Sequence, residues 1–476
     1  MVKHSREITE LDEFYIHRNL LYSNPNFQVS ATFSIDLTPE IIFNAVAQLL
    51  NQYSQWSLQG YPSESAKRKY ELKLLKEYKL SDVLEYKSSK DIKLEDLFTS
   101  LIHKRFPLSS DKPLWNLILY DSKTLIFCAD HLLGDGTSYL NFQTELLKFI
   151  NKPSYVEGLE FTGVDSIIFK DSLFTEKDIS PMQTEIISYK PSPLFLASTA
   201  VKAFLPSVYG IYAKYVPKSK YDGLGSEIFP LNDSDPQIRR EYHLKLLNVS
   251  PEQLIKLLQI CRKHQVKLTS LFANICLLAL HPITKEYALS VEVPANIRSF
   301  IQTDKANKLC NSFSDKFGLY MGPISMKLQS LEKNNSTKKL DWDFMKHVQN
   351  IITNGFKTAN QGVGLLSMVN IEEHVANETT KSRDTLEISN LGMAKFNIDG
   401  DRDAESSSSN NIEIVDMIFN QPVGSRGTCF GCNVLATPKG GANFSLTCVK
   451  ALGPETVKTY ADGFQYWIDQ ALALDV

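Results

Sequence analysis

The sequence predicts a mixed α/β protein made of two domains. Three observations support this: the chain has 476 residues, residues 114–129 form two apolar runs that a helix follows, and a stretch rich in proline, glycine and charge interrupts the middle. One core rarely serves so long a chain. We therefore expect an N-terminal half at 1–216, a linker at 217–239 and a C-terminal half at 240–476.

In the N-terminal half, the two apolar runs of 114–129 predict a buried hairpin with a polar turn. His131 therefore lies just beyond a strand end. A threonine or serine directly after Gly136 can cap the helix that follows. The sequence HLLGDG at 131–136 is thus expected to form a loop between a strand and a helix.

Residues 194–216 are apolar over a length that suggests a membrane span. Lys202 and Pro206 lie in the interior of this stretch, which argues against a spanning helix. Two alternatives remain open: the segment packs on the domain, or it enters a membrane surface.

In the C-terminal half, the pattern SPEQ at 250–253 is a capping box with proline at the first helical position, so it predicts a helix start. Residues 269–280 suit a second, buried helix, and 287–294 suit a strand. Residues 429–452 read as a hairpin that turns at two glycines, and a last helix follows from Pro454.

Composition excludes several classes of protein. The chain has 51 Lys and Arg against 54 Asp and Glu and a net charge of -3, so no broad basic face is available for nucleic acid. The charged N-terminus lacks the apolar core of a secretory signal, and we expect an intracellular protein.

The cysteines suggest neither a disulfide framework nor a metal site. There are 7, an odd number scattered along the chain, which favours reduced thiols. Cys429 and Cys432 have CxxC spacing, but no second pair follows, so we interpret both as strand cysteines in the core. No HxxxH or HExxH pair accompanies the histidine loop, and we expect no metal.

His131 carries the chemistry that the sequence suggests. Histidine titrates at about 6.5 when unperturbed, so it can accept a proton from a nucleophile. Asp135 is too far along the chain to be assumed its relay partner and can hold the loop instead. Gly136 indicates a backbone angle easy only for glycine, or close approach of a ligand. A structural reading stays open, in which the loop satisfies the histidine and the aspartate caps the helix.

The motif H131-L-L-G-D135-G136 resembles the HxxxDG motif of CoA-dependent acyltransferases. Further stretches follow, in order, the layout of fungal alcohol acetyltransferases: HRNLLYSNPNFQVSATF, PLWNLIL, VPANIRSF, ISNLG and FNQP to KGGANFSL. The chain is equally similar to fungal N-acetyltransferases that act on sphingoid-like long-chain amines. The resemblance covers essentially the full chain.

This resemblance implies two chloramphenicol-acetyltransferase-like α/β domains with a channel between them. It implies that His131 is the general base, and that an apolar alcohol or amine attacks the thioester of acetyl-CoA directly, without an acyl-enzyme. Asp135 is then expected to pair with Arg298 of the second domain in a structural role, with Asn296 as a companion and Gly136 completing the motif.

Other site residues are expected by the same route. Ser389 and Asn390 are candidates for hydrogen bonds to the oxyanion or the substrate, although S-N-x-G is equally a turn signature. Arg426 and Lys439 are candidates for contacts with the phosphates of CoA, against the alternative of ordinary surface cations.

Several alternatives stay open at this point. A thioesterase or ester hydrolase could use the same base on water, and a lipid or CoA binding protein would need no base. The acceptor is an alcohol or an amine, and an apolar acceptor would suit a peripheral position on endoplasmic reticulum or lipid droplets. The channel needs no second chain, so we expect a monomer.

Overall fold

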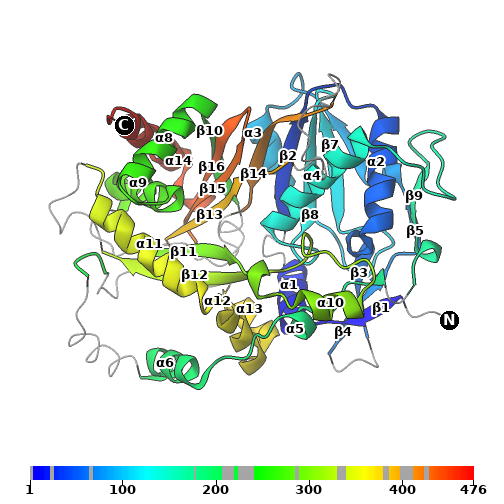
Figure 1. The fold of residues 1–476 in the computed structure, drawn as a ribbon, viewed down its shortest axis with the longest axis horizontal. Helices are drawn as coiled ribbons and strands as arrows, with labels where there is room; N and C mark the ends of the chain where they lie inside the picture. The colour runs from blue at the N-terminus through cyan, green and yellow to red at the C-terminus, as the bar shows by residue number, and fades with distance from the viewer. Residues whose placement is uncertain are drawn as a thin grey trace.

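The computed structural model of the protein contains two main β-sheets side by side, with helices around them (Figure 1). It describes residues 4–21, 26–63, 68–175, 178–205, 219–222, 241–284, 289–329, 339–378, 385–396, 411–422 and 428–475. Most of the predicted linker, 217–239, lies outside these residues, so the division into halves stays a prediction.

The first sheet has the strand order β14-β2-β8-β7-β6. Its strands are β2 (Asn26–Phe33), β6 (Leu84–Lys87), β7 (Trp115–Tyr120), β8 (Thr124–Asp130) and β14 (Ile414–Asn420). The predicted hairpin is confirmed as β7 and β8, and its turn has positive φ at Asp121 and Ser122. Helices α2 (Pro39–Gln52) and α4 (Gly136–Asn151) pack against each other over this sheet (Figure 1).

The second sheet has the order β10-β16-β15-β13-β11-β12. Its strands are β10 (Tyr242–Val249), β11 (Leu289–Asn296), β12 (Met321–Leu328), β13 (Leu386–Met393), β15 (Phe430–Thr437) and β16 (Gly441–Val449). Helices α8 (Pro251–Lys263), α9 (Leu268–Thr284), α11 (Trp342–Phe356) and α14 (Pro454–Leu472) surround it. The predicted capping box is confirmed, since the Ser250 hydroxyl accepts from the Gln253 N–H and the Gln253 side chain accepts from the Ser250 N–H.

One strand crosses between the two halves of the sequence. β14 belongs to the C-terminal stretch, yet it pairs antiparallel with β2 and forms the edge of the first sheet. From there it also lies against β15 and β16 of the second sheet. The backbone therefore joins the two sheets at their common border.

Most of the remaining elements lie below the two sheets in Figure 1. They are α1 (Glu10–Leu20), α3 (Leu94–Leu101), α5 (Gln183–Ile186), α6 (Pro193–Phe204), α10 (Thr303–Leu309), α12 (Ala359–Gly364) and α13 (Ile371–Glu378), with α3 near the opposite edge. Two small sheets, β1 (Ser5–Glu7) with β4 (Tyr70–Leu74) and β3 (Leu58–Pro62), and β5 (Glu77–Lys79) with β9 (Ile167–Lys170), complete the fold.

A membrane span needs a long, continuous and apolar helix. Within the described ranges, no single helix is long and apolar enough to cross one. Helices α8 and α9 have the length and apolar composition of a span only when they are taken together, and the chain bends by 101° between them. Most residues of α9 are buried in the core of the second sheet, as expected for 269–280.

All seven cysteines are buried thiols. Cys429 and Cys432 lie in the core at the start of β15, in agreement with their interpretation as strand cysteines. Among the described residues there is no group of three or more His, Cys, Asp or Glu side chains arranged to hold a metal ion.

Gly441, at the predicted turn between β15 and β16, lies against the backbone of β10. Its φ is +77°, and a Cβ there would lie 2.0 Å from the carbonyl oxygen of Val249. Gly453 has a similar φ of +81°, but nothing lies within 4 Å of its Cβ position. Both positions therefore favour glycine, and only Gly441 also needs it for space.

We expect Gly441→Ala to lower the free energy of unfolding more than Gly453→Ala. Each variant places a Cβ on a residue with positive φ, which costs about 1–3 kcal/mol, but only the first must also move the backbone of β10. Urea unfolding of the two variants would measure the difference. Equal losses would contradict the close approach of Gly441 to Val249.

Candidate active site

The HLLGDG sequence forms the connection from β8 to α4, as predicted. β8 ends at Asp130 and α4 begins at Gly136. Asp135 is the N-cap of α4: its backbone is extended, and its Oδ1 accepts from the N–H of Ser138 at 2.9 Å. The cap explains why an aspartate stands here, because it satisfies an N–H group that has no partner within the helix.

Gly136 is favoured by close packing rather than by an unusual backbone angle. It is the first residue of α4, and it is absent from the glycines with positive φ. A Cβ at this position would lie 2.9 Å from Leu391 Cδ2 and 3.4 Å from Phe419 Cζ. These side chains come from β13 and β14, so the missing side chain lets the start of α4 approach the second half of the chain.

Asp135 also forms an ion pair with Arg298. The two guanidinium nitrogens Nη1 and Nη2 donate to Oδ2 and Oδ1 at 2.8 and 2.9 Å. The backbone N–H of Tyr320 donates to Oδ2 at 3.0 Å. The structure thus brings together the two residues that the resemblance paired, and it makes the contact bidentate.

Arg298 is fixed by further acceptors. Its Nε donates to the carbonyl oxygen of Asp315 at 2.7 Å, and Nη2 donates to the Ser138 hydroxyl at 3.0 Å. Nη1 also donates to Oδ1 of Asn296 at 3.3 Å. The side chains of Arg298 and Asp135 are 11% and 6% exposed, so the pair is shielded from solvent.

This environment keeps Asp135 ionised. Burial alone would raise the pKa of its carboxyl, but the Arg298 charge and the N–H donors of Ser138 and Tyr320 outweigh burial and hold that pKa below its ordinary value. Both carboxylate oxygens are occupied by these donors. Asp135 therefore caps a helix and joins two halves of the chain, and it is not the hydrogen-bond partner of His131.

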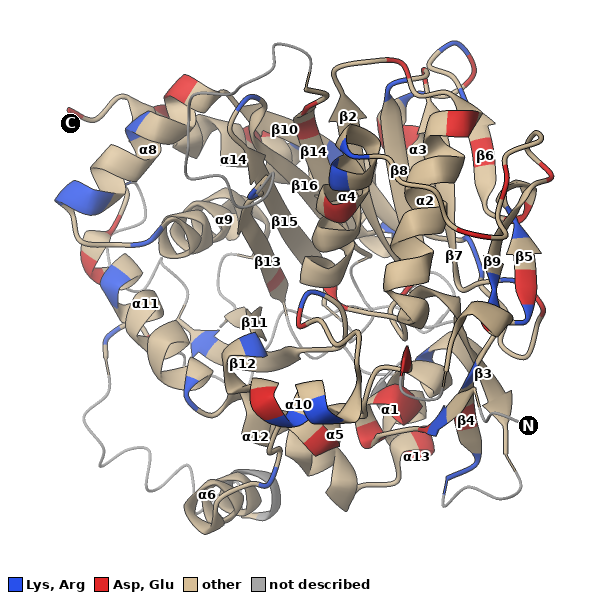
Figure 2. Ribbon diagram, turned by 45° about the vertical axis from the view of Figure 1, so that its right-hand side comes forward, with Lys and Arg blue, Asp and Glu red and all other residues tan. Residues whose placement is uncertain are grey.

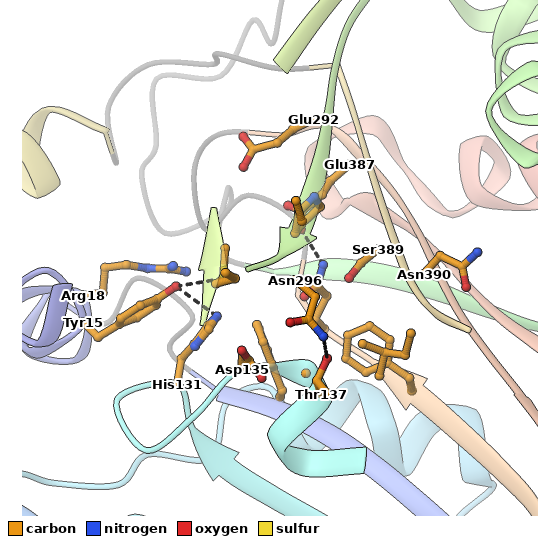
Figure 3. A pocket seen from close by; sticks show the side chains of 18 residues that line it. Tyr15, Arg18, His131, Asp135, Thr137, Glu292, Asn296, Glu387, Ser389 and Asn390 are labelled. Carbon is orange, nitrogen blue, oxygen red and sulfur yellow. Dashed lines mark hydrogen bonds between the residues drawn. The ribbon is translucent and has the colours of Figure 1, made fainter. Parts of the chain in front are cut away.

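His131 is held by aromatic side chains (Figure 3). Its ring stacks on the ring of Tyr15 in α1, with centroids 4.0 Å apart. The centroid of the Phe27 ring in β2 is 4.1 Å from that of His131, and the two rings are tilted by 58°. The Tyr15 hydroxyl is 3.1 Å from Nε2. The other ring nitrogen, Nδ1, is buried and has no hydrogen-bond partner among the described residues.

The burial of His131 favours its neutral form. The residue is 3% exposed, and desolvation, together with the nearby Arg18 charge, lowers its pKa to about 3. A neutral imidazole keeps a lone pair on one ring nitrogen at every physiological pH. The ring is thus a weak base that is always ready to accept a proton.

Both halves of the chain line one cavity in front of His131 (Figure 3). The N-terminal half supplies Tyr15, His131 and Thr137, and strands β11 and β13 supply the opposite wall. About 720 Å³ in and around the cavity is free of protein atoms, and part of this space is open solvent.

The predicted residues Asn296, Ser389 and Asn390 all line this cavity, but in different ways. Asn296 donates to the Thr137 hydroxyl at 3.4 Å, next to the start of α4. Ser389 is 7% exposed and points toward the cavity (Figure 3). The amide of Asn390 instead donates to Thr269 at 3.2 Å and points away from His131 in Figure 3, so it supports the fold of β13.

Of the two predicted CoA-binding residues, the structure describes only Lys439. Lys439 forms an ion pair with Glu413 at the β15–β16 turn, its side chain is 57% exposed, and it does not line the cavity. Its expected role is therefore not supported, because the surface carboxylate next to it explains a lysine at this turn. Arg426 lies outside the described residues.

Several cavity residues were not predicted from the sequence, among them the polar residues Tyr15, Arg18, Glu292 and Glu387. Glu292 and Glu387 are register partners on the parallel strands β11 and β13. The sequence contains a signal for Glu292, because Glu292, Pro294 and Asn296 alternate along one strand and therefore share a face. For Tyr15 the sequence holds no such signal, because its contact with His131 spans 116 residues.

Comparison with known proteins shows which proteins this chain resembles. The model of the alcohol acetyltransferase family matches residues 7–464. The N-acetyltransferase SLI1 of Saccharomyces cerevisiae is 24% identical over 481 residues, which cover 94% of this chain and 97% of that protein. An uncharacterized protein of Schizosaccharomyces pombe is 24% identical over 454 residues, covering 93% and 91%.

Solved structures agree in fold. The trichothecene 15-O-acetyltransferase TRI3 of Fusarium sporotrichioides has a TM-score of 0.65 at 11% identity, covering 99% of this chain and 96% of that one. The condensation domain of the Monacolin K polyketide synthase MokA has a TM-score of 0.58 at 9% identity, covering 99% and 98%. The predicted architecture of two chloramphenicol-acetyltransferase-like halves is thereby confirmed.

Replacing Arg298 with alanine is expected to lower the free energy of unfolding by about 3–5 kcal/mol, because it leaves the buried Asp135 carboxylate without its counter-charge. Arg68→Ala is the matched control. Arg68 also pairs with two carboxylates, of Glu10 and Glu13, but its side chain is 31% exposed. Such a pair is worth about 1 kcal/mol or less. Urea unfolding of both variants measures this, and equal losses would contradict the role given to Arg298.

His131→Asn is expected to make stability less sensitive to acid. The pKa of His131 in the folded protein, about 3, lies below the ordinary histidine value of 6.5, so the unfolded state binds an additional proton between these pH values. The free energy of unfolding of the wild type should then fall more steeply than that of the variant as pH drops below 6.5. Denaturant unfolding at several pH values tests this, and parallel curves would show that His131 is not buried in its neutral form.

Proposed function

Because the chain belongs to the alcohol acetyltransferase family, and is thus an acyltransferase, we propose that it moves the acetyl group of acetyl-CoA to the amine or hydroxyl of an apolar acceptor. His131 is the general base. The observation that carries this proposal is one neutral, buried histidine that faces a cavity lined by both halves of the chain.

His131 supports direct transfer from the thioester to the acceptor. Its unprotonated ring nitrogen takes the proton of the attacking hydroxyl or amine as the new bond to the acetyl carbon forms. It then returns the proton to the sulfur of the leaving thiol. The side chain within hydrogen-bond distance of Nε2 is a tyrosine, not a serine or cysteine that could carry the acetyl group, which favours a mechanism without an acyl-enzyme.

Other residues have positioning roles in this proposal. Tyr15 and Phe27 hold the imidazole ring by stacking, so that its orientation toward the cavity is fixed before substrates bind. Asp135 and Arg298 hold the loop that carries His131 against the second half. Ser389, buried and pointing toward the cavity, is suited to donate a hydrogen bond to the developing oxyanion.

We take an amine rather than an alcohol as the acceptor. Glu292 and Glu387 lie side by side on the wall of the cavity, which Arg18 also lines. Gln421 donates a hydrogen bond to Glu387 and so fixes its orientation. The similarity to a protein named N-acetyltransferase points in the same direction.

The test follows release of free CoA from acetyl-CoA by the purified protein. A long-chain amine, a long-chain alcohol of equal length and a sample without acceptor are compared. We expect release to depend on the amine and to fall by about a hundredfold or more in His131→Ala, the usual contribution of a general base. His347→Ala is the matched control, because that histidine pairs with Asp222 far from the cavity and its loss should leave the rate unchanged.

The other outcomes distinguish the alternatives. Release that no acceptor stimulates would identify a hydrolase that uses the same base on water. Faster release with the alcohol would retain acetyl transfer and overturn the choice of an amine. Activity that survives in His131→Ala would remove His131 as the base.

A further inference from the structure

The hydroxyl of Tyr15 lies next to the ring nitrogen of His131 that the proposed reaction needs. Its oxygen Oη is 3.1 Å from Nε2. Both residues line the cavity, and Figure 3 shows the hydroxyl and the imidazole ring pointing toward each other. A proton from the acceptor must therefore reach a nitrogen that already has a hydrogen-bond partner.

The surroundings of the ring indicate that Nε2 accepts this hydrogen bond. A neutral imidazole has one N–H group and one nitrogen with a lone pair. If Nε2 carried the proton, the lone pair would be on Nδ1, which is buried and out of reach of a substrate in the cavity. Another neighbour of the Tyr15 hydroxyl, Sδ of Met321 at 3.6 Å, is only a weak acceptor. The hydroxyl is thus best placed to donate to Nε2.

Tyr15 is also packed too tightly to move aside easily. The residue is 1% exposed, and its ring stacks on that of His131 with centroids 4.0 Å apart. The ring of Phe14 contacts it edge-on, with centroids 5.3 Å apart. Displacing such a ring costs all of these contacts. Direct approach of an acceptor to the lone pair of Nε2 requires that displacement, whereas transfer through the hydroxyl does not.

A hydroxyl group is suited to pass a proton on. It can donate one hydrogen bond and accept others at the same time, so a tyrosine that donates to Nε2 can also accept from a substrate. The guanidinium carbon of Arg18, another cavity residue, is 5.3 Å from the centroid of the Tyr15 ring. This positive charge favours the negative charge that develops on the phenol oxygen while the proton leaves.

We propose that Tyr15 is a catalytic residue that carries the proton between the acceptor and His131, an inference that rests on the proposed function. As the acceptor attacks the acetyl carbon, its N–H or O–H proton moves to Oη, and the phenolic proton moves to Nε2. When the bond from carbon to sulfur breaks, the proton on Nε2 returns to Oη and the phenolic proton passes to the thiolate. Tyr15 and His131 end as they began, and CoA has gained the proton that the acceptor lost.

The variant Tyr15→Phe removes the hydroxyl and keeps the stacked ring. We expect acetyl transfer in a single turnover to slow by about tenfold or more, because a positioned acid–base group usually contributes a hundredfold or more and water can replace it in part. The affinity for acetyl-CoA should stay the same. Tyr120→Phe is the matched control, because this buried tyrosine of β7 also donates a hydrogen bond, to the Ile92 carbonyl at 3.0 Å, and does not line the cavity. Its rate should equal that of the wild type.

Single-turnover rates in mixtures of H₂O and D₂O distinguish a relay from a positioning role. In the wild type two protons move together, so we expect the rate to depend on the D₂O fraction along a curve. In Tyr15→Phe this dependence should become a straight line, as for one moving proton. A tyrosine that only orients His131 would slow the variant without changing the form of the dependence.

The hydrogen bond itself is tested without any reaction, by ¹⁵N NMR of histidine-labelled protein with His131→Asn to assign the signal. We expect the Nε2 signal of His131 to differ between wild type and Tyr15→Phe. An unchanged signal, a wild-type rate in Tyr15→Phe, or the same curved dependence on D₂O in both proteins would each overturn the relay and leave the proposed function standing. Wild-type protein that transfers acetyl groups to no acceptor would overturn the proposed function, and the relay with it.

Discussion

The ion pair between Asp135 and Arg298 is the interaction on which the rest of the site depends. One carboxylate caps α4, accepts the Tyr320 N–H and binds the guanidinium that closes the second half of the chain against the first. A buried carboxylate is stable only when its charge is compensated, so the distance between the two halves is restricted to what this contact allows. The width of the cavity follows from that restriction.

The same ion pair determines how His131 is held. Because both oxygens of Asp135 are occupied, the histidine is positioned by the stacked ring and the hydroxyl of Tyr15, and by Phe27. Aromatic surroundings exclude water and lower the basicity of the ring. In the proposed reaction, a base of low pKa is never blocked by a proton but draws a proton less strongly, so positioning of the acceptor would have to contribute more to the rate.

The two halves are also joined through the backbone. Strand β14 extends the first sheet and lies against the second, and it brings Phe419 to the glycine that starts α4. A strand shared in this way makes sliding of one half past the other costly, because the ladder with β2 would break.

Local features of the sequence determined much of this protein. The apolar runs around residue 121, the box at 250–253 and the HLLGDG loop encode a hairpin, a helix start and a strand-to-helix connection in neighbouring residues, and all three could be read directly. Residues that alternate along a strand were also readable in principle, as Glu292 and Asn296 show.

Tertiary structure alone decided the remaining features. Arg298 was expected only through the resemblance to a family, since no local rule links it to a carboxylate 163 residues away. Tyr15 meets His131 because α1 packs over the end of β8, and β14 joins β2 although 392 residues separate Asn420 from Gln28. For Lys439 the structure adds the ion pair with Glu413, and a contact with CoA stays a prediction, because a cation beside a glycine turn looks alike at a phosphate site and on an ordinary surface. Which side chains converge is determined by packing between distant segments, and no short stretch of sequence contains that information.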